Sequence, residues 1–187
     1  AFASFPALAA EINRRGKKAL ELGAKPVTPE STKILLSAIK NRDRITLVAA
    51  PGKMGEEYAK QCHVEFSVMG MAGKEASAKE TKRISREMVK KGIELLIFVG
   101  GDGTARDICD AVNSKTPVVG VPAGVKVFSS VFAVSARAAA EMVDAFVEGT
   151  DVTEREVLDI DEDAFRKDRL AARLYGYLIV PNVRNFL

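Results

Sequence analysis

The residues best suited to chemistry lie in a turn at positions 100–104, which reads GGDGT and follows the apolar run 95–99. A short apolar run that ends in glycine is typical of a buried parallel strand, and the apolar residues after the turn recur at helical spacing. In open α/β sheets, ligands bind at the carboxyl ends of the strands, where the first amides of the next helix carry partial positive charge. The pattern therefore predicts a ligand site at this turn.

Four of the five turn residues suit the binding of an anion, and one does not. Gly100, Gly101 and Gly103 can adopt positive φ and lack a Cβ, so a phosphate can come into contact with the backbone. Thr104 could donate its hydroxyl to a phosphate or begin the helix. Asp102 would repel a phosphate unless it binds a metal ion, accepts a proton or caps the helix. An ordinary turn with Asp102 as the helix N-cap is the simplest alternative.

Two segments of the chain resemble one family. GGDGT after an apolar strand is similar to the signature of NAD kinases, diacylglycerol kinases and sphingosine kinases. Residues 120–126 (GVPAGVK) and 128–133 (FSSVFA) are similar to the branch of ATP-NAD kinase-like proteins, which includes acetoin catabolism protein X. The likeness extends from about residue 16 to the end of the chain. It implies a catalytic role for Asp102 and phosphate binding by the rest of the turn.

Five further residues are candidates for the same site. Lys53 lies in the loop after the first evident strand, on the sheet edge predicted to carry the glycine turn, and could reach a phosphate. Gly124, Lys126 and Ser129 belong to the second family-like segment and could contact nucleotide. Asp107 follows the turn by about one helical turn and could support Mg²⁺. The ordinary alternatives are a solvated lysine, a hydroxyl bonded to nearby backbone, and a surface acid near a helix start.

We therefore expect phosphoryl transfer from ATP, or from polyphosphate, to a hydroxyl of NAD, which would give NADP. In this interpretation the glycine amides hold phosphates, Mg²⁺ offsets their charge, and Asp102 orients or deprotonates the attacking hydroxyl, as the resemblance implies. Such transfer depends mainly on positioning and charge stabilisation. The alternative is a nucleotide-binding or regulatory module of the same family without kinase activity.

Composition agrees with a soluble α/β protein. The 187 residues are 47% apolar and 28% charged, which is sufficient for a sizeable core. The net charge is only +3, basic and acidic residues alternate along 74–91, and no basic cluster is interleaved with aromatics, so we expect no nucleic-acid partner. No apolar run approaches the roughly 20 residues of a membrane span, which predicts a cytoplasmic protein without membrane contact. Cys62 and Cys109 are expected to be buried free thiols.

Helical and strand patterns alternate along residues 1–150, which predicts a nucleotide-binding domain with a mainly parallel, doubly wound sheet. Strands are expected at 45–50, 64–68, 95–99 and 117–121. Helices are expected from Thr28, along 74–91, after the glycine turn, and from Ser135 to a stop at Gly149. The apolar face of residues 1–16 suits a further packing helix.

The pattern changes at residue 151. Residues 154–160 and 170–180 are expected to be two strands joined by a charged stretch, as at the opening of an antiparallel β domain spanning 151–187. The resemblance implies that this domain is incomplete, because members of the family continue well beyond the equivalent of Leu187. A lone hairpin is marginal in water, so these strands should pair with more chain, with the first domain or with another subunit. We expect a homo-oligomer.

Overall fold

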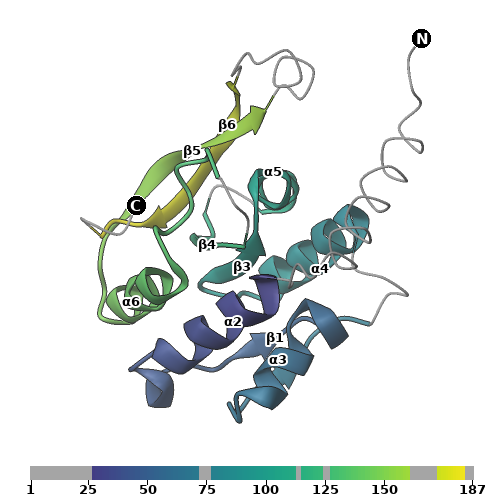
Figure 1. Cartoon of the computed structure of the whole chain (residues 1–187), viewed down its shortest axis with the longest axis vertical. Coiled ribbons are helices and arrows are strands. Elements are labelled where there is room, and N and C mark those ends of the chain that lie inside the picture. Colours follow the sequence, from purple (N-terminus) through teal and green to yellow (C-terminus); the bar gives the residue numbers. More distant parts are fainter. Residues whose placement is uncertain (1–26, 72–76, 113–114, 124–126, 161–171, 184–187) are drawn as a thin grey trace.

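The computed structural model describes residues 27–71, 77–112, 115–123, 127–160 and 172–183 (Figure 1). Its helices are α2 (Val27–Ala38), α3 (Glu56–Gln61), α4 (Ala78–Lys90), α5 (Asp102–Ala111) and α6 (Ala136–Val147), with 3₁₀ turns η1 (Arg42–Arg44) and η2 (Gly52–Met54). Its strands are β1 (Val48–Ala49), β2 (Ser67–Val68), β3 (Leu96–Gly100), β4 (Val118–Pro122), β5 (Val152–Ile160) and β6 (Ala172–Pro181). None of the described helices combines the length and apolar character that crossing a membrane requires. The helix predicted within residues 1–16 lies outside the described residues.

The strands pair two by two. β1 pairs with β2 and β3 with β4, both in parallel, whereas β5 and β6 are antiparallel. This confirms the predicted fold class, an α/β unit with parallel strands followed by antiparallel ones. The parallel strands form two separate pairs, because no backbone hydrogen bond joins β1 to β3 in the described part of the chain.

Helix α6 illustrates how the predicted apolar faces build the core. It begins after Ser135, whose hydroxyl accepts a hydrogen bond from the amide of Ala138 at 3.1 Å, as an N-cap does. Met142 and Val143 on its inner face are buried. The helix ends before Gly149, which adopts φ +93°. Its predicted start and stop are confirmed.

The region between the first two strands differs from the prediction. The strands predicted at 45–50 and 64–68 are each only two residues long in the structure. Helix α3, between them, was not predicted. The amide of Glu56, the first residue of α3, donates to the carbonyl of Ala50 at 2.8 Å. The Ala50 carbonyl is therefore engaged with α3 and does not extend β1. The Glu56 carboxylate also accepts from the amide of Gly52 at 2.9 Å. These contacts close the loop after β1 tightly and start a helix where we expected irregular chain.

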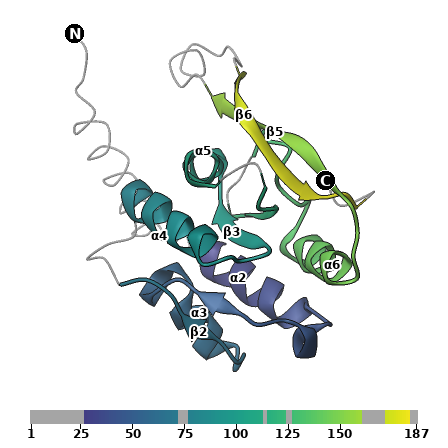
Figure 2. The same ribbon diagram turned by 180° about the vertical axis from the view of Figure 1, so that it is seen from behind.

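The β5–β6 hairpin packs against the preceding part of the chain through α5, β4 and α6 (Figure 2). Val157 and Leu178 are buried at this contact. The amide of Ser130 donates to the carbonyl of Glu156 at 2.9 Å and ties the hairpin to the loop after β4. Of the three predicted ways to cover the hairpin, the structure shows packing on the first domain. That residues 151–187 form a domain of their own stays a prediction.

Both cysteines are free thiols, as predicted, but they are half-buried rather than buried. The Cys109 thiol lies close to the Tyr177 carbonyl, with Sγ at 3.8 Å. Burial, followed by the negative charge of Asp110, raises the pKa of this thiol. Gly176 lets β6 approach α5 here, because a Cβ at that position would lie 2.9 Å from the Cys109 sulfur.

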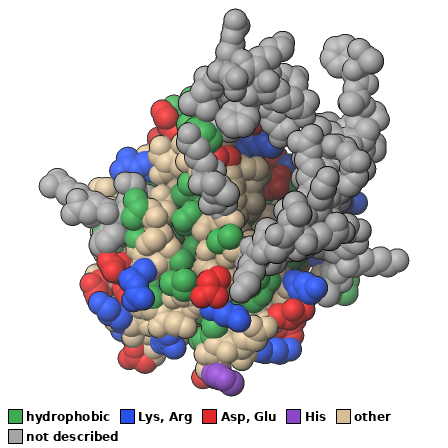
Figure 3. All heavy atoms as spheres, viewed as in Figure 1, with side chains coloured by type: hydrophobic (Ala, Val, Ile, Leu, Met, Phe, Trp, Pro, Cys, Tyr) green, Lys and Arg blue, Asp and Glu red, His purple; other side chains and the backbone are tan. Residues whose placement is uncertain are grey.

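An ion-pair cluster joins α4, α5 and β6. Lys82 Nζ lies 2.5 Å from Asp110 Oδ2 and 3.3 Å from Asp107 Oδ1, and the Tyr175 hydroxyl donates to Asp110 Oδ1 at 2.7 Å. The hydrogen bond from Lys82, followed by that from Tyr175, lowers the pKa of Asp110. The bond to Asp110 is also the main cause of the raised pKa of Lys82. Basic and acidic side chains are similarly intermixed around the lower rim of the face in Figure 3.

The lowered pKa of Asp110 predicts a pH-dependent stabilisation. Its contribution is present above the unfolded-state value of 3.8 and is lost as the pH falls through the lower folded-state value. We expect Asp110→Asn to cost up to about 1 kcal/mol at pH 7, because the group is partly exposed. Thermal unfolding of the wild type and the variant from pH 7 down to pH 2 measures this, and the two Tm values should converge at the acid end. A difference that persists at pH 2 would contradict an ionic origin.

Candidate functional site

The turn after β3 passes directly from strand to helix. Gly101 is the N-cap of α5, with φ −123° and ψ −168°, and its carbonyl accepts the amides of Thr104 at 2.9 Å and Ala105 at 3.0 Å. Asp102 is the first helical residue, and no side chain of the described residues caps this helix end. The alternative in which Asp102 is the N-cap is therefore wrong. Thr104 is the third residue of the helix and does not begin it.

Of the glycines of the turn, Gly100 is needed for space, and none is needed for φ. None of Gly100, Gly101 and Gly103 has positive φ, which corrects that part of the prediction, since the backbone stays extended until the helix begins. A Cβ on Gly100 would lie 2.3 Å from Thr104 Oγ1, so the helix packs directly on the end of the strand. A Cβ on Gly101 would meet nothing within 4 Å. The backbone of Gly101 therefore borders open space, where an anion can approach it.

The Asp102 carboxylate is held by the loop after β4. Its Oδ1 accepts the Ser129 hydroxyl at 2.5 Å and the Ser129 amide at 2.8 Å, and its Oδ2 accepts the Phe128 amide at 3.0 Å. Ser129 is 5% exposed, and its hydroxyl in turn accepts the amide of Leu158 in β5 at 2.9 Å. The acid is thus fixed between two loops. Oδ2, with a single close donor among the described residues, keeps capacity for one more hydrogen bond.

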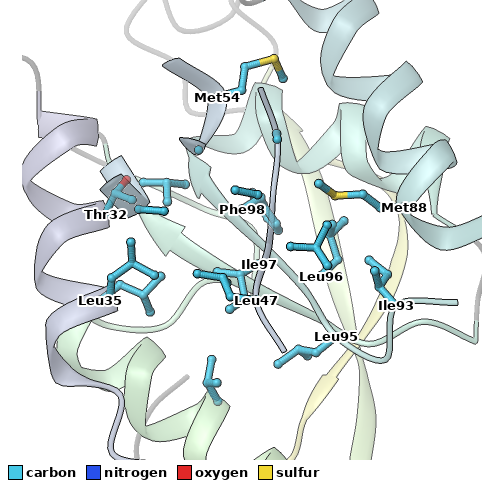
Figure 4. Close-up of a pocket in the computed structure, with 18 of the residues that line it drawn as sticks. Thr32, Leu35, Leu47, Met54, Met88, Ile93, Leu95, Leu96, Ile97 and Phe98 are labelled. Atoms are coloured by element: carbon cyan, nitrogen blue, oxygen red, sulfur yellow. The ribbon is translucent and has the colours of Figure 1, made fainter. Parts of the chain in front are cut away.

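Lys53 lines the same cavity as one residue of the glycine turn. It belongs to η2, and both Lys53 and Thr104 line a cavity of about 530 Å³ between β1 and β3 (Figure 4). The loop that carries Lys53 is fixed by Glu56, whose pKa is lowered mainly by the hydrogen bond from the Gly52 amide and then by that from Lys60. Lys53 itself is exposed. The structure brings the two predicted phosphate-binding loops to one cavity.

The remaining predicted residues are placed less clearly. Asp107 forms an ion pair with Lys82 at 3.3 Å, and the described residues include no group of three or more side chains that could hold a metal ion. Its role as a magnesium ligand stays a prediction. Gly124 and Lys126 lie outside the described residues. Ser129 is engaged with Asp102 and Leu158, so its hydroxyl links two elements instead of projecting freely.

Sequence reasoning missed the partners of Asp102 and one ion pair that supports the same helix. Arg106, in α5, pairs with Asp159 of β5 and lies over the Tyr175 ring, with 5.9 Å from its guanidinium carbon to the ring centroid. These contacts attach the hairpin to the helix that begins with Asp102. No local sequence pattern predicts these contacts, because the tertiary fold alone brings residues 106 and 159 together.

A family model described as the ATP-NAD kinase N-terminal domain matches residues 13–151. This range, well over half of the chain, includes the glycine turn, the Lys53 loop and the loop that holds Asp102. Neither the curated proteins nor the solved structures provide a match.

Proposed function

The chain belongs to the ATP-NAD kinase family, and from this premise we propose that it transfers a phosphoryl group from ATP, or from polyphosphate, to a hydroxyl of NAD to give NADP. The observation that carries the proposal is the position of Asp102. A carboxylate fixed at the start of a helix, beside open glycine backbone, combines a proton acceptor with a phosphate-binding turn. A turn that only bound phosphate would gain nothing from the acid.

The backbone at the start of α5 supplies the donors for phosphate. The first amides of a helix have no acceptor within the helix, and in the described part of the chain those of Asp102 and Gly103 have no backbone acceptor. They add to the positive end of the helix dipole. Because Gly101 carries no side chain, a phosphate can lie close to these amides. The exposed ammonium group of Lys53 would offset the phosphate charge from the neighbouring loop.

In this mechanism Asp102 acts on the acceptor. Its Oδ2 accepts the proton of the attacking hydroxyl as the oxygen bonds to the terminal phosphorus of ATP, while ADP leaves with the electrons of the broken bond. The three donors from Phe128 and Ser129 keep the carboxylate in one orientation, which reduces the reorganisation that the step requires. The same bonds connect the acid to β5 through Ser129.

Magnesium fits this site as an ion carried by the nucleotide. Mg²⁺ in kinases is held by substrate phosphates and one or two carboxylates, so a cage made only of protein ligands is not required. Oδ2 of Asp102 takes the proton of the attacking hydroxyl, and the ion pair of Asp107 with Lys82 engages Oδ1 of Asp107. Oδ2 of Asp107 is therefore the protein oxygen that would hold the ion. Bound there, Mg²⁺ would neutralise charge on the phosphates.

The proposal is tested by incubation of the chain with ATP, Mg²⁺ and NAD, followed by an enzymatic assay for NADP. A parallel reaction with polyphosphate identifies the donor. Formation of NADP that depends on protein supports the proposal. A thermal shift with ATP but no product with either donor would favour the alternative, a nucleotide-binding or regulatory module. Absence of both product and thermal shift would contradict both hypotheses.

Two neighbouring glycines provide a matched test of the phosphate site. We expect Gly101→Ala to leave stability within about 0.5 kcal/mol, because its Cβ enters open space, and to weaken ATP binding by roughly tenfold or more. Gly100→Ala should instead destabilise the fold by about 1–3 kcal/mol, because its Cβ would collide with Thr104. Calorimetric titration with ATP and urea unfolding measure the two effects. Unchanged ATP affinity in Gly101→Ala would place the phosphates elsewhere.

A further inference from the structure

Arg106 lies beside the open start of α5. Helical side chains lean toward the N-terminus of their helix, so the side chain of Arg106 covers the turn that precedes it. A Cβ built on Gly103 would lie 3.9 Å from Arg106 Nη2, and Gly103 is exposed. The guanidinium group therefore borders the first turn of the helix, whose amides the proposed function assigns to phosphate.

Arg106 and Asp102 lie on the same face of α5. Residues four apart are neighbours on a helix surface. Asp102 connects to the Leu158 amide through the Ser129 hydroxyl. Arg106 pairs with Asp159, which follows Leu158 in β5. The carboxylate and the guanidinium group therefore lie next to each other along the hairpin.

Two side chains of the hairpin fix the position of Arg106. Its Nη1 donates to Oδ1 of Asp159, whose Oδ2 lies 3.9 Å from Nη2 of the exposed Arg173. The guanidinium group also lies over the ring of Tyr175, with 5.9 Å from its carbon to the ring centroid. The Tyr175 hydroxyl donates to Asp110 Oδ1 at 2.7 Å, which holds the ring in place. The guanidinium group is thus kept in one orientation from two sides.

β6 carries an extra residue at the ring that supports the guanidinium group. The pairing of β5 with β6 changes register, because Val157 opposes Gly176 whereas Leu158 opposes Leu174. Tyr175 of β6 therefore has no partner on β5, as in a β-bulge. Bulges redirect side chains and are over-represented next to active sites. The hairpin thus departs from regular pairing at the residue that lies under the guanidinium group.

The ion pair leaves part of the guanidinium group available. A guanidinium group has five N–H donors, and Arg106 uses only Nη1 for its bond to Asp159. Among the described residues, Nε and Nη2 of Arg106 have no hydrogen-bond acceptor. The side chain is 40% exposed, so a ligand can reach it. Nε and Nη2 form a planar fork that suits two oxygens of one phosphate.

An anionic acceptor needs a positive charge on the hairpin side of the site. The acceptor brings its hydroxyl to the Asp102 carboxylate, which repels a phosphate on the same molecule. Lys53 belongs to the loop after β1 and lines the cavity together with Thr104. The contacts of Asp102 lead instead to the loop after β4 and to β5. Arg106 supplies the positive charge on that second side.

We propose that Arg106 is a specificity-determining residue, which binds a phosphate group of the acceptor through Nε and Nη2. Asp159 and Tyr175 are its positioning residues. This role rests on the proposed function and sets the class of acceptor, a nucleotide with a phosphate near the reacting hydroxyl. An uncharged nucleoside or sugar would leave the fork without a partner and would be a poor acceptor.

Two variants that break the same ion pair separate phosphate binding from support of the fold. Arg106→Met removes the guanidinium group, whereas Asp159→Asn keeps it and removes only the charge of its partner. Calorimetric titration with NAD should give a Kd about ten- to hundredfold higher for Arg106→Met, the usual loss for a hydrogen bond to a charged group. Asp159→Asn should stay within about threefold of the wild type. The Tm should fall by a similar amount in both variants.

A ligand without phosphate provides a second control. Adenosine has ribose hydroxyls but no phosphate, so Arg106→Met should not change its Kd. In the NADP assay this variant should raise KM for NAD by about ten- to hundredfold and leave kcat within about threefold, as when an interaction is equally strong in the ground state and the transition state. Arg106→Lys, which keeps the charge without the planar fork, should give an intermediate Kd for NAD.

Equal losses of NAD affinity in Arg106→Met and Asp159→Asn would overturn the proposal, because Arg106 would then only link α5 to the hairpin. A loss of adenosine affinity as large as the loss of NAD affinity would also overturn it. If Arg106→Met does not fold, Arg106→Lys takes its place, and unchanged NAD affinity in that variant would contradict the role of the fork.

The same measurements distinguish this role from the proposed function. Wild-type protein that binds NAD but forms no NADP would contradict the proposed function, while the titrations still decide whether Arg106 binds the phosphate. Wild-type protein that forms NADP, with an unchanged KM for NAD in Arg106→Met, would overturn the role of Arg106 alone. Absence of NAD binding by the wild type would overturn both.

Discussion

Asp102→Asn is expected to lower kcat for NADP formation by roughly 10²- to 10⁴-fold, the usual contribution of a general base, while ATP still binds. Asparagine cannot take the proton of the attacking hydroxyl. It can still accept the Ser129 hydrogen bonds through Oδ1, but its NH₂ group then faces the Phe128 amide, which is itself a donor. Steady-state kinetics with NAD and calorimetric titration with ATP measure the two properties separately.

Ser129→Ala is the matched control, because it disturbs the same loop and leaves the carboxylate. Loss of the hydroxyl removes one bond to Asp102 and deprives the Leu158 amide of its acceptor, so we expect a loss of about 1–3 kcal/mol in stability. The effect on kcat should stay below roughly tenfold if Asp102 acts chemically. An equal fall in kcat for both variants would mean that loop position, rather than the carboxylate, limits the reaction. Full activity of Asp102→Asn would remove Asp102 from the mechanism.

The glycine turn could be predicted from the sequence because its signal is local. An apolar run, three glycines and a helical repeat occupy one continuous stretch, so the order strand, turn, helix can be predicted without any distant contact. The expected reason for the glycines is only half right, since a Cβ would collide with the helix at Gly100, whereas none of the three adopts positive φ. The sequence shows where glycine is needed. It does not show whether the reason is the missing Cβ or the freedom to adopt positive φ.

The partners of Asp102 could not be predicted, because the tertiary fold creates them. Phe128 and Ser129 reach the carboxylate from the loop after β4, and Leu158 joins from β5. Likewise, the end of β1 depends on the hydrogen bond from the Glu56 amide to the Ala50 carbonyl. The spacing of apolar residues does not predict this bond. The pattern thus located the acid, and the fold explains how the acid is held.

The second large effect that we expect is on stability, at a buried carboxylate far from the glycine turn. Asp144 of α6 is 7% exposed. Its Oδ1 accepts the amide of Lys40 at 3.1 Å and that of Asn41 at 2.9 Å, and its Oδ2 also lies 3.1 Å from the Lys40 amide. The chain leaving α2 is thereby attached to α6. This attachment holds α2 beside the cavity next to the candidate site.

Asp144→Ala should lower the free energy of unfolding by about 2–4 kcal/mol, because two amides lose the carboxylate of a largely buried residue as their acceptor. Urea unfolding should show a lower midpoint at unchanged slope. Glu148→Ala is the matched control: among the described residues this exposed carboxylate accepts only the Asn41 side chain, at 3.3 Å, and its loss should cost less than about 0.5 kcal/mol. Similar losses for the two variants would mean that water or neighbouring groups replace Asp144, and that α2 is held by apolar packing alone.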